Sequence, residues 1–232
     1  MNNNDIKTAA FASGADICGI ASIERFSNAP AGFHPSDIYK DTKSVVVFAR
    51  RVPKGAVRSG NTLPYSISDE IATDQIRHIT YNFSLLLEDK GIVAVPVYTE
   101  PYAYWDKETF TGKGDLSLKH AGYLAGLGVF GRNHLLYNYK YGNMIKLGAL
   151  LINFEIVPDE IQSFSFCKDT CLLCLKNCPS GALEPDSVIQ KKCRNQSEGL
   201  TLKGYPITTC TACRTLCPYS FGIEKNKLYH AC

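Results

Sequence analysis

The apolar positions in the first 157 residues alternate between patterns typical of strands and of helices. After a short polar helix, residues 14–23 and the β-branched run at 44–49 predict two strands of buried type. Residues 69–90 carry apolar side chains at helical spacing. Residues 92–98 predict a further strand, in which Pro96 indicates a sheet edge or a break. Strand, helix and strand in this order favour a layered α/β sheet.

Residues 117–133 contain the pattern Gly126-x-Gly128-x-x-Gly131, which formally matches a dinucleotide-binding fingerprint. That fingerprint requires a strand before the glycines and a helix after them. Here the order is reversed, because a helix with a glycine cap is predicted before the glycines and an extended segment at 134–137 after them. A nicotinamide site is therefore not indicated. Two interpretations of the glycine pattern remain. It is either a helix end and turn without a ligand, or a turn at which a large flat cofactor can approach the backbone closely.

Residues 100–114 have no clear period and are rich in Tyr, Trp and Gly, so they predict a long loop. Long loops on a rigid scaffold often carry functional residues. We therefore expect the reactive centre in a groove between this loop and the glycine turn at 126–131.

Cysteine is distributed unevenly, since nine of the ten cysteines lie after residue 166. This shift in composition places a domain boundary near residues 158–165. It predicts an α/β cofactor- and substrate-binding domain at 1–160 and a small cysteine-rich domain at 161–232. Eight of these cysteines form two copies of one spacing that ends in Cys-Pro: Cys167, Cys171, Cys174 and Cys178, then Cys193, Cys210, Cys213 and Cys217.

This spacing predicts two [4Fe-4S] clusters whose ligand sets cross. In C-x2-C-x3-C-P runs the cysteine before proline ligates the other cluster, so Cys217 is expected with the first motif and Cys178 with the second. Cys167 departs from the pattern, because three residues rather than the usual two separate it from Cys171. Zinc sites also use paired cysteines, but zinc does not explain two Cys-Pro endings. A disulfide framework is disfavoured because the sequence starts without an apolar signal segment.

Composition adds weaker constraints. The net charge of +3 is too small to indicate nucleic acid by itself, and no apolar run approaches 18 residues, so no membrane span is expected. Without an export signal, oxygen-sensitive clusters predict a cytoplasmic protein. Cys18 lies in the first predicted strand and is expected to be a buried hydrophobe rather than a ligand, and Cys232 is expected to be dispensable.

Three segments together resemble the epoxyqueuosine reductases and the related reductive dehalogenases. They are AGLGVFGRNHLL at 125–136, YGNMIKLG at 141–148, and the cysteine-rich stretch that ends in CPSGAL at residue 183. The resemblance covers roughly residues 90 to 220 well and residues 14 to 50 loosely. It implies a nitroreductase-like α/β domain followed by a small bacterial-ferredoxin-like domain with two clusters.

The resemblance also implies cofactors, partners and site residues. A base-off cobalamin would receive electrons from the nearer cluster, which a low-potential ferredoxin or flavodoxin would supply. The substrate would be a small organic molecule or a corrinoid, and a flavin is the alternative cofactor. Cofactor contacts are expected at Gly126, Gly128, Gly131, Asn133 and Gly142.

The chain departs from this family at the expected proton donor. The family's aspartate lies in a V-D-S-x-P context, where this chain has VYTEP at residues 97–101. Glu100 is the closest carboxylate and is the expected catalytic acid, with Asp106 and Asp115 behind it. Arg132 stands where lysine is usual.

Two function classes remain open from the sequence. One is a cobalamin-dependent reductase, which the glycine turn and the aromatic segment favour. The other is an electron-transfer or corrinoid-handling protein, which the missing aspartate favours. The sequence stops at Cys232 without the helical-repeat extension that many of those enzymes carry for tRNA, so no nucleic acid partner is expected.

Overall fold

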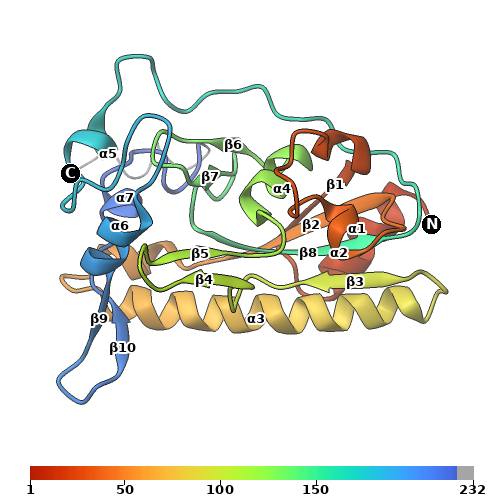
Figure 1. Cartoon of the computed structure of the whole chain (residues 1–232), viewed down its shortest axis with the longest axis horizontal. Coiled ribbons are helices and arrows are strands. Elements are labelled where there is room, and N and C mark those ends of the chain that lie inside the picture. The colour runs from red at the N-terminus through yellow and green to blue at the C-terminus, as the bar shows by residue number, and fades with distance from the viewer. Residues whose placement is uncertain (224–232) are drawn as a thin grey trace.

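The computed structural model describes residues 1–223 and has one main sheet with helices on both faces (Figure 1). The α-helices are α1 (Asn3–Ala12), α2 (Pro35–Ile38), α3 (Leu63–Glu88), α4 (Leu118–Leu124), α5 (Leu173–Lys176), α6 (Gln190–Ser197) and α7 (Ala212–Thr215), and two 3₁₀ turns are η1 (Ile23–Phe26) and η2 (Lys54–Arg58). The strands are β1 (Ile17–Ser22), β2 (Ser44–Arg51), β3 (Ala94–Val97), β4 (Tyr104–Asp106), β5 (Thr111–Lys113), β6 (Val129–Phe130), β7 (Leu136–Tyr137), β8 (Ile145–Ile152), β9 (Glu198–Leu200) and β10 (Pro206–Thr208).

The main sheet has the strand order β1-β2-β8-β3, and all neighbouring strands are antiparallel. The central strands β2 and β8 pair over their full length, from Ser44 opposite Ile152 to Arg51 opposite Ile145. The helix α3 connects β2 to β3 and lies along the sheet, so the connection passes the intervening strand β8 (Figure 1). Both central strands are covered on both faces, which explains their nearly continuous apolar sequence.

Alternate residues of β2 contribute to two separate cores, because successive side chains of a strand point to opposite faces. Val46 and Phe48 pack with α1 and α3, where Phe48 meets Phe83 edge to face at 5.6 Å between ring centroids. Val45 and Val47 pack on the other face with α4 and the residues that follow it. Each such buried side chain contributes about 1.5–3 kcal/mol to folding.

The structure confirms the predicted mixed α/β fold and most of its elements. The predicted strands correspond to β1, β2 and β3, and β3 lies at the edge of the sheet, as Pro96 indicated. The long predicted helix is α3, which begins at Leu63 instead of residue 69 because Pro64 occupies its first turn.

The prediction of a long irregular loop at 100–114 is wrong. The strands β4 and β5 form a hairpin there, with Tyr104 opposite Lys113 and Asp106 opposite Thr111. The side chain of Asp106 accepts hydrogen bonds from the backbone N–H groups of residues 108 and 109 and so stabilises the turn. All three residues of β4 are exposed, so the hairpin lacks the apolar–polar alternation that reveals a half-buried strand.

The short helices of the cysteine-rich part gather at the end of the molecule opposite the N-terminus (Figure 1). The helices α5, α6 and α7 contain no buried residue. The chain reaches them from β8 through residues 153–172, which form no regular element. The domain boundary near 158–165 falls in this segment and stays a prediction. No helix within residues 1–223 is long and apolar enough to cross a membrane.

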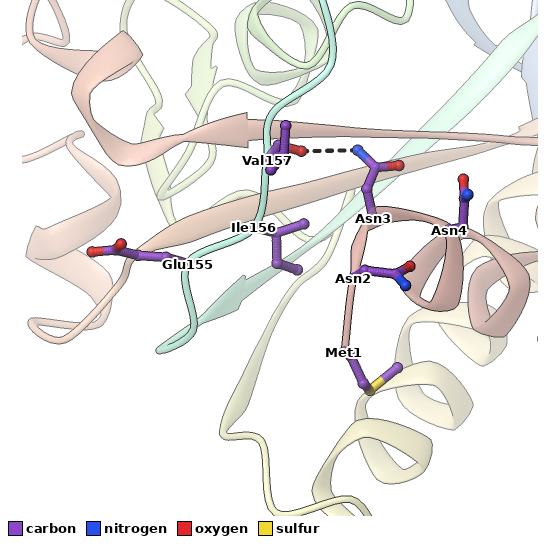
Figure 2. Close-up of a pocket in the computed structure, with 7 residues that line it drawn as sticks. All are labelled: Met1, Asn2, Asn3, Asn4, Glu155, Ile156 and Val157. Carbon is purple, nitrogen blue, oxygen red and sulfur yellow. Dashed lines mark hydrogen bonds between the residues drawn. The ribbon is translucent and has the colours of Figure 1, made fainter.

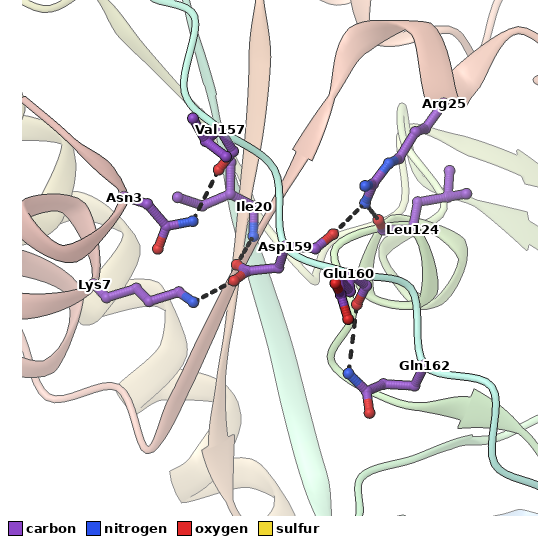
Figure 3. Close-up of polar contacts among 9 residues, drawn as sticks. All are labelled: Asn3, Lys7, Ile20, Arg25, Leu124, Val157, Asp159, Glu160 and Gln162. Atoms are coloured by element: carbon purple, nitrogen blue, oxygen red, sulfur yellow. Dashed lines mark hydrogen bonds and ion pairs between the residues drawn. The ribbon is translucent and has the colours of Figure 1, made fainter.

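Polar contacts anchor the first part of this connecting segment to the α/β domain (Figure 3). One carboxylate oxygen of Asp159 accepts from the backbone N–H of Ile20 at 2.9 Å, and the other pairs with Lys7. Arg25 donates to the carbonyl oxygens of Leu124 and Asp159, both at 2.6 Å. The α/β domain therefore holds the chain as far as residue 159, close to the predicted boundary.

Replacing Asp159 by alanine should lower the free energy of unfolding by about 1–3 kcal/mol, because the N–H of Ile20 loses its side-chain acceptor. Urea denaturation monitored by circular dichroism would measure the loss. Gln162→Ala is the matched control, since the Gln162 amide makes only a long 3.4 Å contact with the carbonyl of Glu160. Equal stability of the two variants would contradict the anchoring role of Asp159.

Candidate metal and cofactor site

The eight cysteines of the two motifs lie on three short helices and in the loops around them. Cys174 is on α5, Cys193 on α6 and Cys213 on α7. All eight are partly buried and none forms a disulfide. The other five lie in loops: Cys167, Cys171, Cys178, Cys210 and Cys217.

A first group of thiols joins Cys217 to the first motif. Burial raises the pKa of Cys174, and the charges of Cys167 and Cys217 raise it further. Burial also raises the pKa of Cys217, and the charges of Cys167 and Cys171 raise it further. A hydrogen bond with Tyr137 acts in the opposite direction and lowers the pKa. These four cysteines are the set that the crossing rule assigns to one cluster, and Cys167 is among them despite its longer gap.

A second group joins Cys178 to the second motif. Burial raises the pKa of Cys213 to about 12, and the charges of Cys193, Cys178 and Cys210 contribute to the increase. The pKa of Cys193 is raised first by burial and then by Cys178 and Cys210, although a hydrogen bond with Ser197 opposes the change. The raised pKa values mean that Cys193 and Cys213 resist ionisation in the absence of a compensating positive charge.

In each group the thiols lie near one another, but they are not close enough to surround a single metal ion. Within the part of the chain that the structure describes, no three His, Cys, Asp or Glu side chains converge closely enough to hold one metal ion. Electrostatic effects between thiols extend farther than the 2.3 Å of a metal–sulfur bond to zinc. The grouping of the thiols fits the two predicted ligand sets, while ligation itself stays a prediction.

Cys178 has surroundings suited to a thiolate. Its sulfur accepts a hydrogen bond from the backbone N–H of Ala182 at 3.3 Å and lies 3.6 Å from the hydroxyl of Ser180. Burial acts to raise the pKa of Cys178, but the bond with Ser180 and the backbone N–H bonds outweigh burial, so its pKa is lowered. Hydrogen bonds to cluster sulfurs are one of the means by which proteins set reduction potentials.

The glycines expected to contact a cofactor pack against the protein's own backbone. A Cβ atom at Gly126 would lie 2.3 Å from the carbonyl oxygen of Glu160, and one at Gly128 would lie 2.0 Å from that of Tyr137. At Gly142, a Cβ would lie 2.1 Å from the carbonyl oxygen of Ser220.

Gly131 and Asn133 are similarly enclosed. A Cβ at Gly131 would lie 2.5 Å from the Tyr137 ring, and the buried amide of Asn133 donates to the Tyr137 hydroxyl at 2.8 Å and to the carbonyl of Cys213 at 3.1 Å. Close packing within the protein is therefore sufficient to explain these residue types. Their contact with a cofactor stays a prediction.

The expected groove between the glycine turn and residues 100–114 stays a prediction, while the hairpin itself contacts the helix α6. Gly112 exchanges hydrogen bonds with Gln190 of α6, at 3.0 and 3.3 Å. A groove of about 460 Å³ lies at this contact, lined by Glu100, Pro101, Tyr102, Arg194, Ser197, Glu198 and Thr208. Residues of the hairpin approach and of the cysteine-rich part thus share one depression.

Glu100 lies at the rim of this groove and is partly solvated. Its side chain is 46% exposed and pairs with Arg77 at 3.8 Å. In the register of VYTEP against V-D-S-x-P, Tyr98 rather than Glu100 occupies the place of the aspartate. A phenol can also donate a proton, so Tyr98 is a second candidate that the alignment of the two motifs indicates and that an expectation limited to carboxylates leaves out.

The other acidic and imidazole candidates are Asp106, Asp115, His120 and His134, which either make hydrogen bonds or are exposed to solvent. Hydrogen bonds from Thr109 and from the backbone lower the pKa of Asp106, which keeps that carboxylate ionised, and Asp115 is exposed. His120 Nδ1 lies 2.7 Å from the Ser117 hydroxyl, and His134 Nε2 lies 2.9 Å from the carbonyl of Glu184. These contacts agree with structural roles for both histidines.

Two further features lie outside this site. A second depression of about 340 Å³ lies at the N-terminus, between residues 1–4 and 155–157, and contains none of the predicted site residues (Figure 2). Cys18 is buried in the core beside α1, and burial raises its pKa to about 12, as expected for a structural thiol. Cys232 lies outside the described residues.

Comparison with known proteins gives the same two enzyme families that the sequence resembles. No protein-family model matches the chain. An epoxyqueuosine reductase of Lactococcus garvieae is 32% identical over 112 residues, which are 44% of this chain and 31% of that protein. A tetrachloroethene reductive dehalogenase of Dehalobacter restrictus is 28% identical over 173 residues, which are 73% of this chain and 27% of that protein. This chain is a relative of both.

Solved structures of both families share the fold. The epoxyqueuosine reductase of Streptococcus thermophilus matches 96% of this chain and 67% of its own, with a TM-score of 0.68 and 21% identity. A reductive dehalogenase described with a mechanism for B12-dependent dehalogenation matches 96% of this chain and 32% of its own, with a TM-score of 0.68 and 19% identity. The matched segments span less than a third of the length of the two sequence relatives. A shared fold does not by itself transfer the activity of the whole enzymes to this chain.

One structural neighbour bears on the expectation of no nucleic acid partner. An epoxyqueuosine reductase structure contains a modified tRNA stem loop, and it matches 94% of this chain with a TM-score of 0.67 and 18% identity. That RNA belongs to the enzyme in that structure, and the expectation of no nucleic acid partner for the present chain stays a prediction.

Serine substitutions should test the crossing of the two groups. Cys217→Ser and Cys171→Ser should each leave about four iron atoms per chain, and combining them should remove no more, because both act on one cubane. Combining Cys217→Ser with Cys213→Ser should remove nearly all iron. Iron and sulfide assays on anaerobically reconstituted protein would measure this. Cys18→Ala is the control with full iron content, and nearly complete iron loss in the first double variant would refute the grouping.

Proposed function

We propose that this chain is an iron–sulfur redox protein that passes low-potential electrons through two [4Fe-4S] clusters to a corrinoid, for the reduction of a small organic substrate. The observation that carries the proposal is the association of the eight thiols in two groups of four, each completed by a cysteine of the other motif. The relationship to epoxyqueuosine reductases and reductive dehalogenases supports the corrinoid.

Each part of the chain has a separate task in this proposal. One cluster would be ligated by the first group of thiols, Cys167, Cys171, Cys174 and Cys217. The other cluster would be ligated by the second group, Cys178, Cys193, Cys210 and Cys213. A bound corrinoid would supply a strongly nucleophilic reduced metal, chemistry that amino-acid side chains cannot provide. The α/β domain would bind the corrinoid and the substrate, exclude water and deliver a proton. A ferredoxin or flavodoxin in a reducing cytoplasm would supply the electrons.

Proton delivery would come from the segment that leads into the hairpin. The phenol of Tyr98 and the carboxylate of Glu100 both lie there, with side chains that remain accessible at 40% and 46% exposure. The carboxylate of Glu100 is already engaged in a contact with Arg77 at 3.8 Å. Tyr98 has the register of the family aspartate, and its phenol O–H is a hydrogen-bond donor.

A second function is favoured by one specific observation. The glycine turn is filled by the backbone of residues 137 and 160, so a corrinoid would need another surface or a displaced segment. An electron-transfer protein that reduces a partner's corrinoid or flavin needs no such space. Cobalt and flavin assays distinguish these two functions.

Anaerobic reconstitution should yield about eight iron and eight sulfide per chain, with broad visible absorption that bleaches on reduction, because two cubanes hold four of each. Added cobalamin should copurify with the reductase and not with the electron carrier. Flavin content and binding of a tRNA stem loop should be measured on the same preparation. Stoichiometric zinc without charge-transfer absorption would sink the proposal.

The variants Tyr98→Phe and Glu100→Gln should separate the two proton donors. If Tyr98 delivers the proton, its loss should slow turnover about 10²- to 10⁴-fold, the usual contribution of a general acid, without changing cofactor content. Glu100→Gln should then retain most activity. The reverse order would return the role to Glu100, and two fully active variants would exclude both. A substrate screen with reduced protein, read by product formation, provides the assay.

A further inference from the structure

The hairpin β4–β5 is attached to the helix α6 by three side chains of that helix. The guanidinium carbon of Arg194 lies 5.0 Å from the ring centroid of Tyr102 and 4.9 Å from that of Trp105. The two rings are nearly parallel, at 22° and 6.2 Å, so a single cation contacts an aromatic pair. Gln190 exchanges two hydrogen bonds with Gly112, and Lys191 donates to the carbonyl of residue 108 at 2.8 Å.

Arg194 is enclosed by these contacts. Its side chain is only 16% exposed and donates to Glu198 at 2.8 Å and to Gln190 at 3.2 Å. Its Nε is buried without a hydrogen-bond partner among the described residues. A cation is held here at a cost in hydration, which is consistent with a role in fixing the geometry of its neighbours.

Apart from the hairpin, α6 is held mainly by polar contacts with Thr209, whose N–H donates to the carbonyl of Ser197 at 2.8 Å. None of its eight residues is buried, so apolar packing contributes little to its position. Cys193 lies within the helix, immediately before Arg194, and belongs to the second group of thiols. Ligation of Cys193 would therefore fix the helix at the residue next to the one that holds the hairpin.

We propose that Arg194 is a positioning residue, which holds the hairpin and the groove beside Glu100 against the helix that carries Cys193. The coupling to a cluster rests on the proposed function, because it takes Cys193 as a ligand. It follows that loading the second group of thiols orders the hairpin, and that a protein without iron has a loose groove.

Trp105 is the single tryptophan of the chain, so its fluorescence reports on the hairpin alone. In the full-length reconstituted protein, Arg194→Ala should shift the emission to longer wavelength and increase quenching by acrylamide. Loss of the contacts with both rings should lower the docked population about tenfold. Arg194→Lys keeps the charge but not the planar group, and should give an intermediate result.

The matched control is Lys192→Ala, which removes one charge from the same helix at an exposed position that makes no contact with the hairpin. It should have wild-type emission. Emission and quenching of Arg194→Ala that equal those of Lys192→Ala at the same iron content would overturn the proposal.

Two further measurements keep the test decisive. If Arg194→Ala loses iron, Arg194→Lys, which keeps the charge on α6, takes its place at full iron content; Trp105 emission and quenching equal to those of the wild type there would overturn the proposal. Removing iron from the wild type should reproduce the emission of Arg194→Ala, and an unchanged spectrum would refute the coupling. A chain that never binds iron would end both the proposed function and the coupling, whereas equal emission of Arg194→Ala and Lys192→Ala at full iron content would overturn the positioning role and leave the proposed function standing.

Discussion

In the proposed ligation, the exchange of Cys178 and Cys217 between the two motifs would constrain the whole cysteine-rich part of the chain. Each group of four thiols contains one residue from the opposite motif, so neither group can close while the other motif is displaced. The helices that carry these thiols bury no residue, and apolar area is too small to fix them. If the eight thiols bind clusters as proposed, metal binding would be the main source of folding free energy for this part, as in other small metal-dependent domains.

The α/β domain is stabilised in a different way and presents a surface to which the cysteine-rich part fits. Two apolar cores on opposite faces of β2 and β8 hold the sheet without metal. Gly142 brings the two parts into backbone contact, since a Cβ atom there would lie 2.1 Å from the carbonyl oxygen of Ser220. A side chain at this position would force the two surfaces apart, so the fit of the two parts depends on a residue that contains no functional group.

The hairpin β4–β5 links the two kinds of stability. It belongs in sequence to the α/β domain, but its aromatic residues and Gly112 bind the helix α6 of the cysteine-rich part. Residues that border the groove are thus held by the element nearest the second group of thiols. Such an arrangement lets the redox part influence access to the groove without any change in the sheet.

The sequence by itself determined the elements and residues whose signal is local. Apolar runs identified β2 and α3, Pro96 identified an edge strand, and the Cys-Pro spacing predicted the two groups of thiols. These features depend on neighbours within a few residues, or on a ligand spacing that metal chemistry dictates. The tertiary structure decided the rest. It made residues 100–114 a hairpin, whose first strand is exposed throughout and carries no alternation, and it brought Arg194 to Tyr102 and Trp105 across about ninety residues of chain. It also placed protein backbone against the glycine turn, because what approaches a glycine depends on distant segments that no local pattern encodes.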